Sequence, residues 1–433
     1  MKRILIICLS VISFLGLNAQ DVFVPINFDA LQKKIVKSDA EIADPKKGID
    51  PKIWLKRGKL MLNATDVDLE QIYEGMNPTI LASFYKEPVV STEDFDGRSQ
   101  QVYTYERIKF YFENDGLASW VRLKSAYENS TTEAYKCFTK AIELDVAGKL
   151  TEELYEDFNK LKVQLKKNGI NAYYRGDKEA ALDNFEMVLE INKLPISKNF
   201  IDTIMIQYSG IIAREMNQYE RSIKHYKELA SVDNQPNTFL VLKEDYLKLK
   251  DTVNAVITME KALEKFPDTL NVVANLVDLY IRTNRIEDGL KTINASIAQN
   301  PAKGEFYYWK GRLQLNTTAD DRIAQALESY VLSIEKNPDL YYAYYDIGYI
   351  YFLQGQDLFE RAGIEKDKKY REEMIALGAE NFNKSLPNLE KALELNISNR
   401  EIKKETLDTL KRVYYKLEMT DKYDEASEKL KNI

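Results

Sequence analysis

The residue types that most often carry catalysis or bind metals are scarce in this 433-residue chain. It contains one histidine, His225, and two cysteines, Cys8 and Cys137. A Ser-His-Asp triad, a Cys-His pair with a further base, or a zinc site of His and Cys ligands needs more such residues than the chain offers. His225 stands beside Tyr226 in a helical stretch and is interpreted as a packing or surface residue. We therefore expect neither catalytic residues nor a metal site.

Carboxylates and glycines are common but do not form functional patterns. The acidic residues at 152–157 suit the first turn of a helix, where the helix dipole favours negative charge. The segment Asp320-Asp321 lacks the regularly spaced Asp, Asn, Gly and Glu residues of a calcium-binding loop. No Gly-Lys-Ser or Gly-Lys-Thr follows a glycine loop, so no phosphate-binding loop is expected. We expect no cofactor and no enzymatic activity. A carboxylate-based enzyme with its site in residues 63–117 stays an alternative.

An aromatic cluster is the feature most suited to binding a ligand. Seven aromatic residues fall between positions 341 and 352. Four of them are spaced by three, four and three residues, which places them on one face of a helix. Exposed rings give rigid contact area and are enriched at binding hot spots. The four residues of this stripe are Tyr342, Tyr345, Tyr349 and Phe352.

The composition indicates that helices position these residues. Only 17 Gly and 11 Pro occur in the whole chain, which is too few to separate many short strands. Pro267 and Pro301 are 34 residues apart, and Pro338 follows after another 37. Proline lacks an amide hydrogen and disfavours a helical residue before it, so each should end a helix. Small residues recur at fixed offsets before the first two prolines, at Ala255 and Ala262 and at Gly289 and Ser296.

This pattern resembles the tetratricopeptide repeat (TPR), in which small residues lie where two antiparallel helices touch. The resemblance implies an all-α, right-handed superhelical solenoid of antiparallel helix pairs, with about seven repeats and some insertions. It also implies a concave groove lined by the aromatic stripe and by residues of the preceding repeat. The expected groove residues are Tyr308, Arg312, Tyr342, Tyr345, Tyr349 and Phe352. The chain is similar as well to exported TPR proteins of Gram-negative bacteria.

The repeat is interrupted twice. Trp54 and Gly58 match a first repeat helix, but residues 63–117 contain prolines and polar runs, and 102–112 has strand-like composition without clean alternation. Gly348 and Ser385 are 37 residues apart, where the repeat allows 12. The expected organisation is a signal peptide (1–19), N-terminal helices and a first repeat helix (20–62), an irregular insertion (63–117), and a TPR solenoid (118–433) with an inserted segment (357–380) and a C-terminal capping helix.

The first residues have the order of a secretory signal peptide. Lys2 and Arg3 precede an apolar run of fourteen residues, which is shorter than the roughly 20 that span a bilayer, and Asn18-Ala19-Gln20 follows. Cleavage is expected near Ala19, with no lipidation at Cys8. The sequence therefore predicts an exported protein that is periplasmic or associated with the outer membrane, without direct membrane insertion. Cys137 would then be the remaining cysteine, so no internal disulfide is expected.

Charge and repeat together point to a class of function. Loss of Lys2 and Arg3 changes the net charge from -7 to -9, and such an acidic chain is not expected to bind nucleic acid. We interpret the chain as a non-catalytic scaffold that binds a protein or peptide partner in the cell envelope. The alternative is a module that binds a small ligand or glycan through the tyrosine stripe. A third possibility is structural: the inserted segment 357–380 folds back and buries the same rings.

Overall fold

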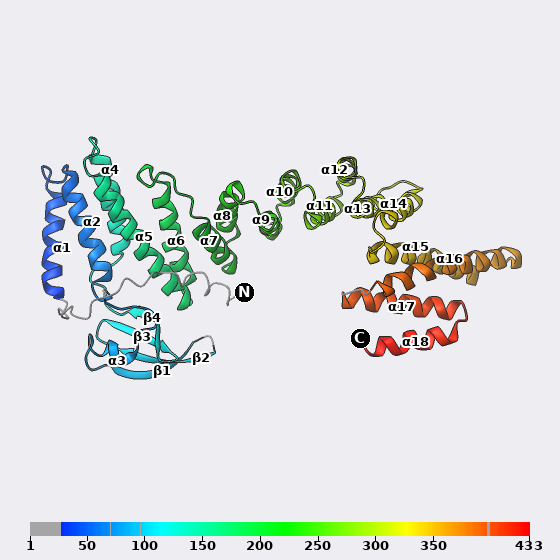
Figure 1. Cartoon of the computed structure of the whole chain (residues 1–433), viewed down its shortest axis with the longest axis horizontal. Coiled ribbons are helices and arrows are strands. Elements are labelled where there is room, and N and C mark those ends of the chain that lie inside the picture. The colour runs from blue at the N-terminus through cyan, green and yellow to red at the C-terminus, as the bar shows by residue number, and fades with distance from the viewer. Residues whose placement is uncertain (1–26, 70, 96, 396–398) are drawn as a thin grey trace. The chain divides into compact units, whose positions relative to one another are not determined.

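The computed structural model describes residues 27–69, 71–95, 97–395 and 399–433 (Figure 1). The expected signal peptide and its cleavage point lie outside these residues. The chain divides into two compact units, residues 1–218 and 219–433. Helices dominate both units, which confirms the expected all-α helical solenoid, with one small sheet as an addition.

The first unit is built mainly from helices that pack with their neighbours in the chain, except where the sheet is inserted. Its second helix, α2, instead packs against α4, although 63 residues separate them. A Cβ atom on Gly58 of α2 would lie 2.3 Å from the Phe138 ring of α4, so only glycine fits at this contact. The helices are α1 (Phe28–Ala43), α2 (Pro51–Asp66), α4 (Ser130–Leu144), α5 (Thr151–Tyr174), α6 (Lys178–Lys193) and α7 (Thr203–Glu215).

The segment between α2 and α4 forms an antiparallel meander of four strands in the order β1-β2-β3-β4. The sheet extends past the expected boundary at 117, and helix resumes at Ser130. In β3 the consecutive residues Phe110, Tyr111 and Phe112 are all buried, which explains why the sequence shows no alternation there. The elements are α3 (Pro78–Leu81), β1 (Val89–Phe95), β2 (Arg98–Thr104), β3 (Ile108–Glu113) and β4 (Gly116–Arg122).

Side chains of α5 and of the turn after it hold the sheet. Asn171 bonds both backbone groups of Trp120 in the edge strand β4: it accepts from the N–H at 2.9 Å and donates to the carbonyl at 2.9 Å. The Arg175 guanidinium lies 3.7 Å from the centre of the Tyr111 ring and 4.4 Å from that of Phe95. Asn171 satisfies the backbone groups of one residue at an otherwise unpaired strand edge, and both sets of contacts fix the sheet on the helices.

The second unit consists of helices α8 to α18, paired along the chain. The prolines at 267, 301 and 338 each stand two residues after the last residue of a helix, so each marks a helix end as the sequence predicts. The helices are α8 (Tyr219–Val232), α9 (Pro236–Lys248), α10 (Thr252–Lys265), α11 (Leu270–Arg282), α12 (Ile286–Gln299), α13 (Gly304–Gln314), α14 (Arg322–Lys336), α15 (Tyr341–Ile364), α16 (Lys368–Glu394), α17 (Arg400–Lys416) and α18 (Thr420–Lys431).

The inserted segment 357–380 lengthens both helices of one hairpin, α15 and α16. At its base, the Ser385 hydroxyl donates to the Gly348 carbonyl at 2.7 Å, so these two residues meet as the repeat requires. Further out, a Cβ atom on Gly355 would lie 2.8 Å from the Phe382 ring, and one on Gly378 would lie 2.7 Å from the Phe359 ring. Glycine therefore allows the two long helices to approach along the insertion as well.

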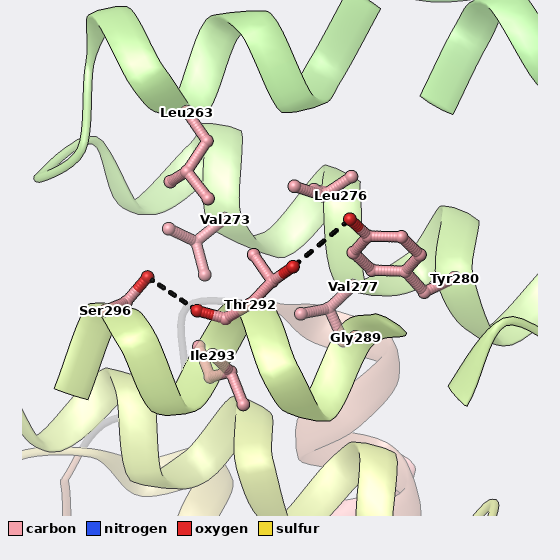
Figure 2. A pocket seen from close by; sticks show the side chains of 9 residues that line it. All are labelled: Leu263, Val273, Leu276, Val277, Tyr280, Gly289, Thr292, Ile293 and Ser296. Carbon is pink, nitrogen blue, oxygen red and sulfur yellow. Dashed lines mark hydrogen bonds between the residues drawn. The ribbon is translucent and has the colours of Figure 1, made fainter. Parts of the chain in front are cut away.

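Packing between repeats leaves a cavity of only ≈ 10 Å³ against α11 and α12 (Figure 2). Its wall includes Tyr280, whose hydroxyl lies 3.3 Å from Thr292 Oγ1 and 2.9 Å from a Glu260 carboxylate oxygen. A volume of about 10–15 Å³ is the minimum that holds one water molecule. This cavity belongs to the core and is too small for a ligand.

Candidate binding groove

The six residues expected to line the groove differ in exposure. All lie in the second unit, on α13 and α15. Tyr349 is 37% exposed, whereas Tyr308 and Phe352 are each only 5% exposed. Arg312, Tyr342 and Tyr345 are half-buried. Four of the six therefore reach the surface, and the other two lie in the core beneath them.

Three of the rings form a continuous ladder along α15. Tyr345 stacks on Tyr349, with ring centres 5.6 Å apart and planes 12° apart, and Tyr349 stacks on Phe352 at 6.0 Å. Phe352 in turn packs on Phe382 of α16 at 6.0 Å. The Tyr345 hydroxyl donates to a Glu405 carboxylate oxygen of α17 at 3.4 Å. The ladder thus begins in the core and ends at the surface.

The remaining three residues form a second cluster. Tyr308 packs on Tyr342 with ring centres 4.4 Å apart and on Tyr330 of α14 at 5.5 Å. Arg312 donates from Nη1 to the Tyr308 hydroxyl at 3.4 Å. Burial raises the pKa of Tyr342 and of Tyr345 above the ordinary range, so both rings keep their hydroxyl protons.

Asp346 completes this second cluster and was not identified from the sequence. Some of the residue remains accessible, but its carboxyl group lies deep beside the Tyr308 and Tyr330 hydroxyls, and this burial raises its pKa. The charge of Arg312 and the two hydroxyls act in the opposite direction and offset only part of the effect. The sequence does set this residue apart, since Asp346 is the single acidic residue between Leu340 and Gln356.

Replacing Asp346 by Asn should stabilise the second unit at neutral pH. Because the folded-state pKa is raised, the native state binds the proton more tightly than the unfolded chain does, and stability falls as pH rises from about 4 through the folded pKa. Asp346→Asn removes this loss. Denaturant unfolding at pH 7 and at pH 4.5 measures the difference in unfolding free energy from the unaltered protein. The stabilisation should be larger at pH 7, and an equal difference at both pH values contradicts the assignment.

The single histidine and Cys137 lie in the core. His225 is 2% exposed within α8 and Cys137 is fully buried in α4. Burial, followed by the nearby Glu133 charge, raises the pKa of Cys137 to about 12, so the thiolate needed for nucleophilic attack is disfavoured at neutral pH. Within the described ranges, no group of three or more His, Cys, Asp or Glu residues is arranged to hold a metal ion. Among those same residues, no helix is long and apolar enough to cross a membrane.

Comparisons with known proteins give structural likenesses at low sequence identity. A TPR repeats protein from Bacteroides fragilis is 16% identical, covers 57% of this chain and 97% of its own, and has a TM-score of 0.33. A monomeric mutant of IFIT1 with Gppp-AAAA is 16% identical, covers 70% of this chain and 66% of its own, and has a TM-score of 0.35. YrrB, a TPR protein with an unusual peptide-binding site, is 18% identical over 48% of this chain and 95% of its own, with a TM-score of 0.28.

No family model and no curated protein matches the sequence. The fold is therefore assigned from the repeat in the chain itself. The 34-residue spacing of Pro267 and Pro301 marks helix ends, and Gly58 and Gly348 lie at helix contacts that a larger residue would block. This period, these contacts and the antiparallel helix pairs give the chain the helical-solenoid fold of tetratricopeptide-repeat proteins.

Proposed function

We propose that this protein is a non-catalytic scaffold that binds a protein or peptide partner in the cell envelope through the surface around Tyr345 and Tyr349. The observation that carries the proposal is the ring ladder, because an aromatic anchor that is rigid before binding loses little conformational entropy on binding. Tyr349 is 37% exposed yet is stacked on both sides. Fold alone does not define a partner, so the proposal rests on this surface.

The stacking favours a peptide over a sugar. A sugar ring needs an open aromatic face, but the faces of Tyr349 are turned toward Tyr345 and Phe352. What Tyr349 offers a ligand is its ring edge and its hydroxyl, which can donate to a peptide carbonyl or accept from a peptide N–H. The alternative glycan-binding function therefore receives less support from this geometry.

Arg312 adds a cationic group beside the rings. Its guanidinium carries five N–H donors, and its described hydrogen bond to Tyr308 uses one. Among the described residues, no carboxylate lies within 4.0 Å of this guanidinium, although the Asp346 charge acts on it from further away. A partner carboxylate could therefore pair with Arg312 in a planar fork. Tyr308 and Phe352 would support this surface from below without touching the partner.

The test is selection of peptides from a random displayed library with the full chain, followed by affinity measurement on single variants. Tyr349→Ala should weaken binding of the selected peptides about thirtyfold, the usual minimum for a hot-spot aromatic. The matched control is Tyr370→Ala on α16, because Tyr370 is 58% exposed and outside the ladder. Melting curves of both variants should stay close to that of the unaltered protein.

Three results distinguish the alternatives. Peptides that bind Tyr349→Ala as tightly as the unaltered protein contradict the proposed surface. A glycan array that yields ligands where the peptide library yields none supports the alternative function. The envelope location is tested separately by mass spectrometry of the protein from its native cells, because an intact Met1 would exclude processing near Ala19.

A further inference from the structure

The first unit contains a surface pocket of ≈ 180 Å³ that is distinct from the ring ladder. Helix α5 forms one wall, the end of α6 contributes a second, and the loop before α7 closes the third. Pockets for drug-sized ligands usually have volumes of about 300–1,000 Å³, so this one suits a smaller chemical group. Its lining residues are Asn159, Lys162, Val163, Lys166, Asn192, Phe200 and Asp202.

The pocket carries one positive charge that is not balanced locally. Lys166 forms an ion pair with Asp202 at 2.8 Å, and the other carboxylate oxygen of Asp202 accepts from the Met205 N–H at the start of α7. Lys162 instead donates to the neutral amide oxygen of Asn192 at 3.1 Å. In the part of the chain that the structure describes, no carboxylate lies within 4.0 Å of the Lys162 ammonium.

Two further observations describe the polar groups around Lys162. Burial lowers the pKa of Lys162, with a further contribution from the like charge of Lys166, and the opposing effects of Tyr155 and of the more distant Asp202 offset only part of this. Asn192 is 2% exposed, and its Nδ2 donor is buried with no hydrogen-bond partner among the described residues. A cation and an unpaired N–H donor among the lining residues of one pocket both favour an oxygen anion.

The rim of the pocket is apolar. Val163 is 65% exposed and Phe200 is 59% exposed, although both line the pocket. Ile201 and Ile204, which follow Phe200 closely in the chain, are also exposed, at 49% and 53%. Apolar side chains that gather around a concave site mark a binding surface more often than scattered ones do.

We propose that this pocket binds the carboxylate of an apolar monocarboxylic acid, with the charged group at Lys162 and the apolar part against Val163 and Phe200. The single unbalanced charge matches a monoanion better than a phosphate dianion. Two sources offer this chemistry, a free organic acid and the carboxyl terminus of a peptide with an apolar last residue. The proposal is independent of the ring ladder, which lies in the other unit.

Calorimetric titration of the full chain with hexanoate and with its neutral isostere hexanamide tests the proposal. Hexanoate should bind, and hexanamide should bind at least tenfold more weakly, since it lacks the charge. A peptide ending in Leu, with a free or an amidated carboxyl terminus, distinguishes the sources. Tighter binding of the free peptide than of hexanoate assigns the site to peptide ends, whereas tighter binding of hexanoate assigns it to free acids.

Variants locate the site. Lys162→Met keeps most of the side-chain volume and should lower hexanoate affinity at least tenfold, whereas Lys149→Met, at an exposed position before α5, should not change it. Phe200→Ala should lower the affinity severalfold, and because Phe200 is 59% exposed this variant leaves the core intact if Lys162→Met unfolds. The proposal is overturned if hexanamide binds as well as hexanoate, if no probe binds at 10 mM (about 10 times a weak Kd of 1 mM), or if folded Lys162→Met retains full affinity.

Discussion

Phe382→Ala should lower the unfolding free energy of the second unit by about 3–5 kcal/mol, the usual cost of removing a large ring from a packed core. Phe382 is 1% exposed and packs on Phe352 at 6.0 Å and on Phe359 at 5.3 Å. The Gly355 backbone lies against the same ring, so the long hairpin has no flexible side chain there to fill the space. Denaturant unfolding followed by circular dichroism measures the loss.

The matched control for this cavity is Leu353→Ala, one residue after Phe352 on α15. Leu353 is 46% exposed, and surface substitutions of this kind usually change stability by no more than about 0.5 kcal/mol. A loss below about 1 kcal/mol for Phe382→Ala would contradict the packing of the α15–α16 hairpin. The result also bears on the proposed groove, because Phe352 links Phe382 to the ring ladder.

Arg57→Met should destabilise the first unit by about 3 kcal/mol, at the lower end of the range for breaking a buried ion pair. The Arg57 side chain is 3% exposed, and its guanidinium lies 2.7 Å from an Asp39 oxygen and 3.0 Å from a Glu133 oxygen. Removing it leaves Glu133, which is 23% exposed, without this counter-charge. The low end applies because Asp39 is 51% exposed and can be solvated by water.

The neighbouring Lys56 provides the control, because its ammonium group lies at the surface. The Lys56 side chain is 69% exposed and lies 3.6 Å from Glu41, whose side chain is 14% exposed. Because the ammonium group stays in water, the pair should contribute only about 0–1 kcal/mol. Lys56→Met should therefore leave the unfolding midpoint in urea nearly unchanged. Equal effects of the two substitutions would show that Arg57 is solvated in solution and that α1, α2 and α4 pack differently from the arrangement described.

Asp346→Asn should change stability for a different reason from the other two substitutions. Phe382→Ala and Arg57→Met remove favourable contacts, whereas Asp346→Asn removes the cost of a buried charge. At pH 7 we therefore expect opposite signs: Arg57→Met should lower the unfolding free energy, whereas Asp346→Asn should raise it. The buried Asp346 carboxyl group lies beside the proposed partner surface, where Arg312 would interact with both Asp346 and a ligand carboxylate.

The repeat and its register were accessible from the sequence because they depend on local rules. Proline ends a helix wherever it occurs, and a small residue must stand where two helices touch. Gly58 therefore faces Phe138, and Gly348 meets Ser385, even though long insertions separate the members of each pair. The scarcity of His and Cys was equally accessible, since it depends only on residue counts.

The insertion at 63–117 and the exposure of each ring were decided by the tertiary structure. Strand β3 is buried in consecutive positions, so it shows no alternating pattern, and the backbone of Trp120 in the edge strand bonds to Asn171 of α5, 51 residues further along the chain. Tyr308 and Phe352 occupy groove positions by spacing, yet helices α14 and α16 cover them. Spacing determines which face of a helix a residue occupies, but burial depends on what packs on that face, and here the partners come from other helices.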